Sequence, residues 1–453
     1  MERAPGQPLP SRLSLHWSWR RIIWQVLPMV AIALGAFLLA RGSGDGEASA
    51  SPSARVDPQY EQRLAANIEF FETRVQETHD SLSYNRLVSL YLGRLRLHGD
   101  TSDVVRAELA ATKSLEVAPN AYSSVISMAL VRLAQHDFEG VLTLAQRAQE
   151  LRPNEPDALA ISGDANMALG RYDEAGRDYA EYLDKAPGFS AFSRKATYEE
   201  AIGSVAVAEQ FWQAAIDSTR LDSPIDSAWA RVQLGTLRTK IGDLKGAESQ
   251  FEMALKVFPG YTLADAGLAQ VAAMRGDFDE ALERFARVTA SYPSPIFVAE
   301  YAEVAERAGE PTIAGQQAAL MGALGQLFEA NGIKNDLTLI LFQADHGTVG
   351  DALLASARAA YEARPSLAAA DTYAWVLYRA GHFDEAQKYA NEALHPGTKE
   401  PLYLFHAGMI AKARGDEATA RKDLEAALEL NPNFHPLHAP EARKALKELG
   451  GAQ

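Results

Sequence analysis

The sequence predicts an all-α fold in which one membrane-spanning helix precedes a superhelical array of helical hairpins. Three observations support this prediction: an uncharged stretch of 19 residues near the N-terminus, prolines that recur about every 34 residues, and two amphipathic helical patterns between successive prolines. With 453 residues, the chain exceeds what one hydrophobic core usually supports. An elongated array, in which each unit packs on its neighbours, has no such limit.

Composition and charge restrict the class of protein. Hydrophobic residues make up 47% and charged residues 23%, as in an average soluble protein, so most of the chain is expected to fold in water. The absence of cysteine excludes disulfides, thiolate metal sites and cysteine nucleophiles. Residues 1–41 carry a net charge of +4, so the remaining residues hold −19 against the total of −15. Such an acidic body repels phosphate backbones, and nucleic acid is therefore not an expected partner.

Residues 22–40 are predicted to form a transmembrane helix or signal anchor. The stretch contains no charged residue and, as a helix, spans about 28 Å, close to the thickness of a bilayer core. Four arginines precede it and only Arg41 follows, so residues 1–21 are expected to stay in the cytoplasm. We therefore expect a single-pass protein of the inner (cytoplasmic) membrane with its body outside the cytoplasm, in the periplasm or at the cell surface.

A cleaved signal peptide is the alternative interpretation of this segment. Ala48-Ser49-Ala50 resembles a cleavage site, and Arg20-Arg21 faintly resembles a twin-arginine signal. However, the apolar run is longer than a usual signal core, and the cleavage-like residues begin eight positions beyond its end. An uncleaved anchor is therefore favoured. Residues 41–56, rich in Gly, Ser and Ala, then form a flexible linker between membrane and body.

From residue 57 onward, recurring proline defines a repeat. Successive units carry a small residue in the first helical pattern, a turn such as Gly-Asp-Phe or Gly-Arg-Tyr, and Ala-rich packing positions in the second. The closing prolines are Pro119, Pro153, Pro187, Pro224, Pro259 and Pro293. The clearest unit contains Gly235, Gly242, Ala247, Phe251, Ala254 and Pro259.

These residues resemble the tetratricopeptide repeat family, whose unit is a 34-residue helix–turn–helix. The resemblance covers residues 83–434 and implies an α/α superhelical solenoid, with Gly163, Gly235 and Gly408 where two helices cross. About ten units are expected: 83–120, 121–154, 155–188, 189–224, 225–260, 261–294, 295–321, 333–366, 367–397 and 398–434, with an irregular stretch at 322–332.

Capping helices are expected within 57–82 and 435–453, the latter including the tail. Because each unit should contact only its neighbours, deletion of residues 155–188 is expected to leave the rest folded.

Stacked units should form a concave face lined mainly by first helices, and this face is the expected partner-binding surface. Helical offsets place six candidates there: Trp229, Trp375, Tyr378, Arg379, Phe405 and Met409. Aromatic residues, Arg and Met are types that anchor protein interfaces. The alternative is that each packs in the core between repeats, as aromatic residues at helical spacing often do. Trp375, Tyr378 and Arg379 are the preferred set, because an arginine is costly to bury unpaired.

The sequence contains none of three common catalytic motifs: His-Glu-x-x-His, a phosphate loop ending in Gly-Lys-Ser/Thr, and a Gly-x-Ser-x-Gly nucleophile elbow. We therefore predict a non-enzymatic protein with no catalytic residue, no cofactor and no small-molecule substrate. His435 and His438 are weak candidate metal ligands, with His395 and His406 as further ligands. Pro436 disrupts regular helical spacing between the first two, so a structural role for this turn is favoured.

The preferred function is a membrane-anchored extracytoplasmic scaffold or adaptor in a bacterial envelope. It would bind proteins or peptides through the concave groove and contact the membrane through residues 22–40. Two alternatives stay open. One is an accessory subunit that organises an envelope assembly, secretion or polysaccharide-export machine. Family members of this layout resemble assembly factors for such machines. The other is a metal-handling periplasmic protein built on the C-terminal histidines.

Overall fold

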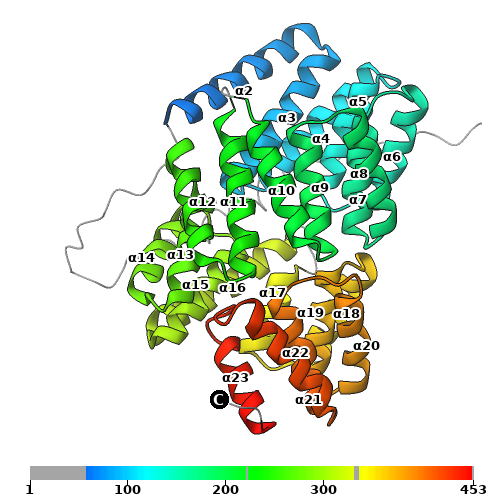
Figure 1. Ribbon diagram of the computed structural model, residues 1–453. Helices are drawn as coiled ribbons and strands as arrows, with labels where there is room; N and C mark the ends of the chain where they lie inside the picture. The colour runs from blue at the N-terminus through cyan, green and yellow to red at the C-terminus, as the bar shows by residue number, and fades with distance from the viewer. Residues whose placement is uncertain (1–57, 221–222, 331–335, 451–453) are drawn as a thin grey trace, which may run out of the picture. The chain divides into compact units, whose positions relative to one another are not determined.

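The computed structural model describes residues 58–220, 223–330 and 336–450, all within the unit Ser53–Gln453 (Figure 1). These residues form 22 α-helices and no β-strand. The segment 1–21, the predicted transmembrane helix 22–40 and the predicted linker 41–56 lie outside the described residues. Among the helices described, none combines the length and the hydropathy that a bilayer crossing requires.

Twenty of the described helices pair into ten helical hairpins, one close to each expected unit. Three bounds differ: α3 begins two residues early, α11 begins one residue early, and α16 ends nine residues late. The first helices are α3 (Ser81–His98), α5 (Tyr122–Ala134), α7 (Asp157–Ala168), α9 (Phe189–Ala201), α11 (Pro224–Lys240), α13 (Thr262–Arg275), α15 (Pro295–Ala308), α17 (Leu337–His346), α19 (Leu367–Arg379) and α21 (Pro401–Ala413). The second helices are α4 (Ser102–Val117), α6 (Phe138–Leu151), α8 (Tyr172–Lys185), α10 (Val205–Asp217), α12 (Leu244–Val257), α14 (Phe278–Ser291), α16 (Pro311–Ala330), α18 (Asp351–Ala363), α20 (Phe383–Leu394) and α22 (Glu417–Leu430). Helix α2 (Pro58–Thr78) packs on α3, and α23 (His438–Glu448) packs on α21 and α22.

Helix α16 differs from the sequence-based expectation. It continues to Ala330, so the prediction of an irregular stretch from residue 322 is wrong for its first nine residues. Met321 and Leu324 are buried and pack with Phe342 of α17. Burial of this apolar face outweighs the weakening effect of glycines inside a helix, about 1 kcal/mol each.

Glycines allow the two helices of several hairpins to cross closely. A Cβ atom added at Gly163 would lie 2.4 Å from the ring of Tyr179, and one at Gly235 would lie 2.6 Å from the ring of Phe251. Both aromatic residues are almost completely buried. The small residues of the repeat pattern therefore mark positions where a larger side chain has no room.

The Gly-Asp turns of the pattern position the start of each second helix. Gly242 has a φ of 77°, in the left-handed region that favours glycine. Asp243 then accepts a hydrogen bond from the backbone N–H of Gly246 at 2.9 Å, as an N-cap residue. Asp416 caps α22 in the same way, through the N–H of Thr419 at 3.1 Å. The recurring dipeptide thus ends one helix and begins the next.

The structure also contains contacts between units that are far apart in the sequence, and we call these contacts the seam. The turn between α9 and α10 meets the segment between α20 and α21, where a Cβ on Gly203 would lie 2.0 Å from the carbonyl oxygen of Gly397. The turn between α7 and α8 meets the end of α18 similarly, since a Cβ on Gly170 would lie 2.1 Å from the carbonyl oxygen of Pro365. Backbone therefore packs directly on backbone at the seam.

Polar groups add to the seam. The backbone N–H of Leu367 donates to the Tyr172 hydroxyl at 3.0 Å. The Asn431 side-chain amide donates to the carbonyl of Thr239 at 2.7 Å. The ammonium of Lys240 lies 2.8 Å from Glu200 and 3.0 Å from Glu400. The expectation that each unit contacts only its neighbours is therefore wrong for the units that form the seam.

Candidate functional site

The structure gathers several of the predicted partner-binding residues around one side chain, Trp375 of α19. Its ring stacks on Tyr378 with centroids 4.7 Å apart and on His406 of α21 with centroids 4.1 Å apart. Phe405 lies 5.7 Å away and His438 of α23 lies 5.8 Å away, both measured between centroids. We call these five residues the C-terminal aromatic cluster.

Burial divides the predicted residues into two groups. Trp375, Phe405 and Met409 are 1%, 0% and 7% exposed, so the structure places them in the core between helices rather than on an open face. Neighbouring helices and α23 cover these positions, which is the core alternative that the sequence left open. Tyr378 is half-buried and Arg379 is exposed. Their role in partner binding stays a prediction, and only the second group offers surface to a partner.

Trp229 lies apart from the cluster, on α11. Its ring contacts Trp212 and Phe189 with centroid distances of 5.5 and 6.0 Å, which places it between the fourth and fifth units. The residue is half-buried, so part of the indole is accessible. Trp229 therefore serves inter-repeat packing, and its partner binding likewise stays a prediction.

Asp345 at the end of α17 connects the C-terminal aromatic cluster to the exposed Arg379. Its carboxylate accepts a hydrogen bond from Nε1 of Trp375 at 2.8 Å. Nη1 of Arg379 lies 3.9 Å from the same oxygen, and Nη2 donates to the Asp345 backbone carbonyl at 3.4 Å. Arg379 is thus paired without being buried.

The two C-terminal histidines reach carboxylates on other units. Nε2 of His435 lies 3.0 Å from Glu303 on α15, and Nε2 of His438 lies 3.5 Å from Asp345. The backbone N–H groups of Leu437 and His438 donate to Nδ1 of His435 at 3.2 and 3.3 Å. That nitrogen is therefore unprotonated, and the imidazole proton of His435 lies on Nε2, facing Glu303.

The histidines do not converge as metal ligands. Both nitrogens of His435 are engaged, and Nδ1 of His438 lies 3.4 Å from Glu441. His406, a suggested further ligand, instead contacts Asp371 at 2.9 Å, and His395 is exposed at the end of α20. In the part of the chain that the structure describes, no group of three or more metal-ligating side chains has the geometry to hold an ion.

Burial and charge pairing shift the pKa values of this site. Burial lowers the pKa of His438, but hydrogen bonds with Asp345 and Glu441 outweigh it and raise the pKa to about 9. Burial raises the pKa of Glu303, but its interactions with His435, His346 and His438 outweigh it and lower the pKa to about 2. At neutral pH, His438 is therefore a cation among ionised carboxylates.

Glu303, Asp345 and His346 are site residues that the sequence analysis did not identify. They lie at least 89 positions before His435, and no motif links the two segments. His346 lies 3.8 Å from Glu303 and 3.4 Å from Glu306, through its two ring nitrogens. The only sequence signal for this site was the close spacing of His435 and His438.

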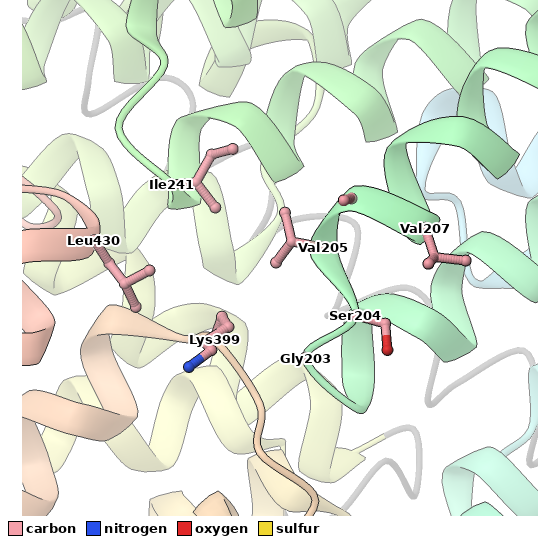
Figure 2. Close-up of a pocket in the computed structure, with 8 residues that line it drawn as sticks. Gly203, Ser204, Val205, Val207, Ile241, Lys399 and Leu430 are labelled. Carbon is pink, nitrogen blue, oxygen red and sulfur yellow. The ribbon is translucent and has the colours of Figure 1, made fainter.

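A shallow pocket lies at the seam, with a volume of about 540 Å³. Figure 2 shows Leu430 and Lys399 on one side of it, facing Ile241 and Val205. Its lining residues are Gly203, Ser204, Val205, Ala206, Val207, Ile241, Lys399 and Leu430. Because most of these side chains are apolar, the pocket suits an apolar side chain of a partner rather than a polar substrate.

Three segments of the chain match models of the tetratricopeptide repeat: residues 126–188, 240–304 and 373–433. No curated protein matches the sequence. Among solved structures, yeast Tom70 is 14% identical, with 86% of this chain and 93% of that chain covered and a TM-score of 0.37. YrrB, described as a TPR protein with an unusual peptide-binding site, is 22% identical, with 42% and 95% covered and a TM-score of 0.29. PilW, described as a type IV pilus biogenesis factor, is 16% identical, with 45% and 92% covered and a TM-score of 0.38.

Proposed function

We propose, from the tetratricopeptide repeats that the chain contains, that this protein is a non-catalytic scaffold or adaptor that binds protein or peptide partners. The observation that carries the proposal is the series of ten helical hairpins from α3 to α22 in the described residues. Stacked hairpins of this kind present extended surfaces to other chains. We infer no cofactor, nucleic acid or small-molecule substrate.

The exposed end of α19 is the partner-binding position that we favour. Tyr378 and Arg379 combine an aromatic ring with a guanidinium, the residue types that dominate interface energies. Arg379 is exposed, and the ring of Tyr378 is held in place by stacking on Trp375. Ordered side chains lose less conformational entropy when a partner binds.

Site-specific crosslinking in intact cells tests this proposal. A photoreactive amino acid replaces Arg379 in one version of the chain and Lys388, an exposed residue on α20, in the control. We expect a discrete crosslinked partner from position 379 and none from position 388. Tyr378→Ala should then weaken capture of that partner by about 2 kcal/mol, roughly 30-fold, as for a hot-spot residue. Equal crosslinking at both positions would contradict the assignment of the surface.

We also propose that residues 22–40 anchor the scaffold in the inner membrane, with the repeats outside the cytoplasm. The uncharged stretch and the arginines that precede it support this orientation. Fusions of alkaline phosphatase and of green fluorescent protein to the C-terminus test it, because the first is active only outside the cytoplasm and the second fluoresces inside. An inactive phosphatase together with a bright fluorescent fusion would refute the orientation. The mass of the mature chain distinguishes an anchor from a cleaved signal.

A further inference from the structure

The start of α23 is attached to the rest of the unit by two histidine–carboxylate pairs. His435 contacts Glu303 of α15, and His438 contacts Asp345 of α17, so both bonds reach units other than the hairpin that precedes α23. The completely or almost completely buried apolar residues of α23 itself are three alanines, Ala439, Ala442 and Ala445. Alanine side chains bury little apolar area. The partly buried Leu446 and the pair of Lys412 with Glu448 hold the later part of α23, so the histidine pairs fix mainly its start.

This attachment covers the buried part of the aromatic cluster. The ring of His438 stacks on Phe405 with centroids 4.8 Å apart and meets Trp375 edge-on at 5.8 Å. His435 stacks on His438 in turn, at 4.4 Å. If the start of α23 moves away, the side chains that lose their cover are therefore Phe405 and Trp375.

We propose that His435 and His438 form a proton-controlled latch, which holds α23 over Trp375 and Phe405 near pH 6.5 and releases it as the pH moves in either direction. The proposal follows from the geometry of the two rings. His435 can keep its contacts only while it is neutral, whereas His438 can keep its contacts only while it is protonated. The docked state therefore needs one histidine in each form.

His435 responds to acid. Its Nδ1 accepts the N–H groups of Leu437 and His438, which lie at the start of α23, and protonation of that nitrogen would displace both. Burial lowers the pKa of His435, against the opposing effect of Glu303. A group with a lowered basic pKa binds more protons in the released state, so docking weakens as the pH falls below about 6.5.

His438 responds to alkali. Its two nitrogens lie 3.5 Å from Asp345 and 3.4 Å from Glu441, so a neutral ring leaves one carboxylate without a donor. With its pKa raised to about 9, the docked His438 keeps a proton that the released ring loses above about pH 6.5. Docking therefore weakens as the pH rises from 6.5 toward 9.

Other charged groups around the two rings do not reverse these signs. The groups come from every helix that contributes to the site: Glu300, Glu303 and Glu306 of α15, Asp345 and His346 of α17, Asp371 and Arg379 of α19, His406 of α21, and Glu441 of α23. A hydrogen bond to Glu303 raises the pKa of His346, and burial raises the pKa of Glu300 to about 8. Loss of either proton adds negative charge near the site and so holds the proton on His438 more strongly, which moves the alkaline release to higher pH without reversing its sign. Arg379 stays charged throughout.

Thiol labelling of the full chain tests the latch, because the sequence has no cysteine of its own. Ala442→Cys places a thiol on the buried face of α23, and Lys444→Cys places one on its exposed face. Labelling of any thiol becomes faster as the thiol ionises with rising pH. Dividing the rate of Ala442→Cys by the rate of Lys444→Cys removes this effect, so the ratio measures release of α23. We expect Ala442→Cys to be best protected near pH 6.5, with release increasing at least about tenfold by pH 8.5. A second increase is expected below about pH 6.

Histidine variants in the Ala442→Cys chain show which histidine causes each increase in labelling. We call the increase above pH 6.5 the alkaline limb and the increase below about pH 6 the acid limb. His438→Gln should flatten the alkaline limb, His435→Gln should flatten the acid limb, and His395→Gln, at an exposed histidine, should keep both. Ala208→Cys, buried in α10, should stay protected across the range and so exclude global unfolding. A flat profile for Ala442→Cys with the native histidines overturns the proposal, even where a variant fails to fold. Limbs that persist in both variants overturn it too. No partner is needed, so the result is independent of the scaffold function.

Discussion

The ring of Phe251 is enclosed by two glycines, and this arrangement yields a sharp prediction for Gly235→Ala. A Cβ at Gly235 would lie 2.6, 2.8 and 2.9 Å from three ring carbons of Phe251. On the side of α13 the ring already occupies the side-chain space of Gly267, where a Cβ would lie only 2.4 Å from it, so it is packed close to that backbone and has little room to move. Phe251 is 0% exposed, so no solvent space is available either. The added methyl group must therefore force the helices apart.

Two opposing terms set the magnitude. Alanine stabilises a helix interior by about 1 kcal/mol relative to glycine. Overpacking a filled core costs about 1–3 kcal/mol, and contacts below 3 Å place Gly235→Ala in the upper part of that range. The net expectation is a loss of about 1–2 kcal/mol. Gly93, inside α3, has no heavy atom within 4 Å of its Cβ position, so Gly93→Ala should gain about 1 kcal/mol.

Denaturant unfolding followed by circular dichroism measures both variants. We expect their midpoints to move in opposite directions and their unfolding free energies to differ by about 2–3 kcal/mol. In a double-mutant cycle, Phe251→Leu should relieve part of the cost of Gly235→Ala, because the smaller side chain leaves room for the methyl group. If Gly235→Ala stabilises the protein as much as Gly93→Ala does, the close crossing of α11 and α12 is wrong.

Three further substitutions or deletions test the seam and the core. Gly203→Ala combines backbone strain with a 2.0 Å approach to Gly397, whereas Gly276→Ala has similar strain and open space, so the first should lower the melting temperature by several degrees more than the second. Trp375→Ala should lower the unfolding free energy by about 3–5 kcal/mol, measured by denaturant unfolding, since the side chain is buried. A loss below about 1 kcal/mol would show instead that the side chain is exposed. Deletion of residues 155–188 removes the seam contacts of Gly170 and Tyr172, so calorimetry should show weakened units near Pro365, not merely a shorter array; unchanged protection there in hydrogen exchange would refute this coupling.

The parts of the fold that the sequence predicted depend on local signals. Proline period, crossing glycines and Gly-Asp turns each act within one hairpin, and their roles are visible at Gly235 and Asp243. The seam could not be predicted in this way. Asn431 and Thr239 are 192 positions apart, and the contact uses a backbone carbonyl, which has no residue-type signature.

The site shows the same division between local and distant information. Helical offsets correctly placed Trp375, Tyr378 and Arg379 on one helix, but offsets alone do not reveal what covers each side chain. Trp375 is buried because α21 and α23 pack over it, whereas Arg379, four positions later, stays exposed. The exposure of a side chain in a repeat array therefore depends on which later helices cover it, here including the last helix α23, as well as on its position within a unit.

Asp345 couples the proposed partner surface to the proposed latch, because it contacts both Arg379 and His438. A partner carboxylate at Arg379 would offset the positive charge of that guanidinium beside Asp345, and the proton on His438 would then be held more strongly. The alkaline release of α23 should consequently move to higher pH. Arg379→Glu imitates this change, so Ala442→Cys labelling in that variant should show the alkaline limb displaced upward, with the acid limb nearly unchanged. Displacement to lower pH would contradict the coupling. By linkage, release of α23 must in turn weaken binding of a carboxylate-bearing partner at Arg379.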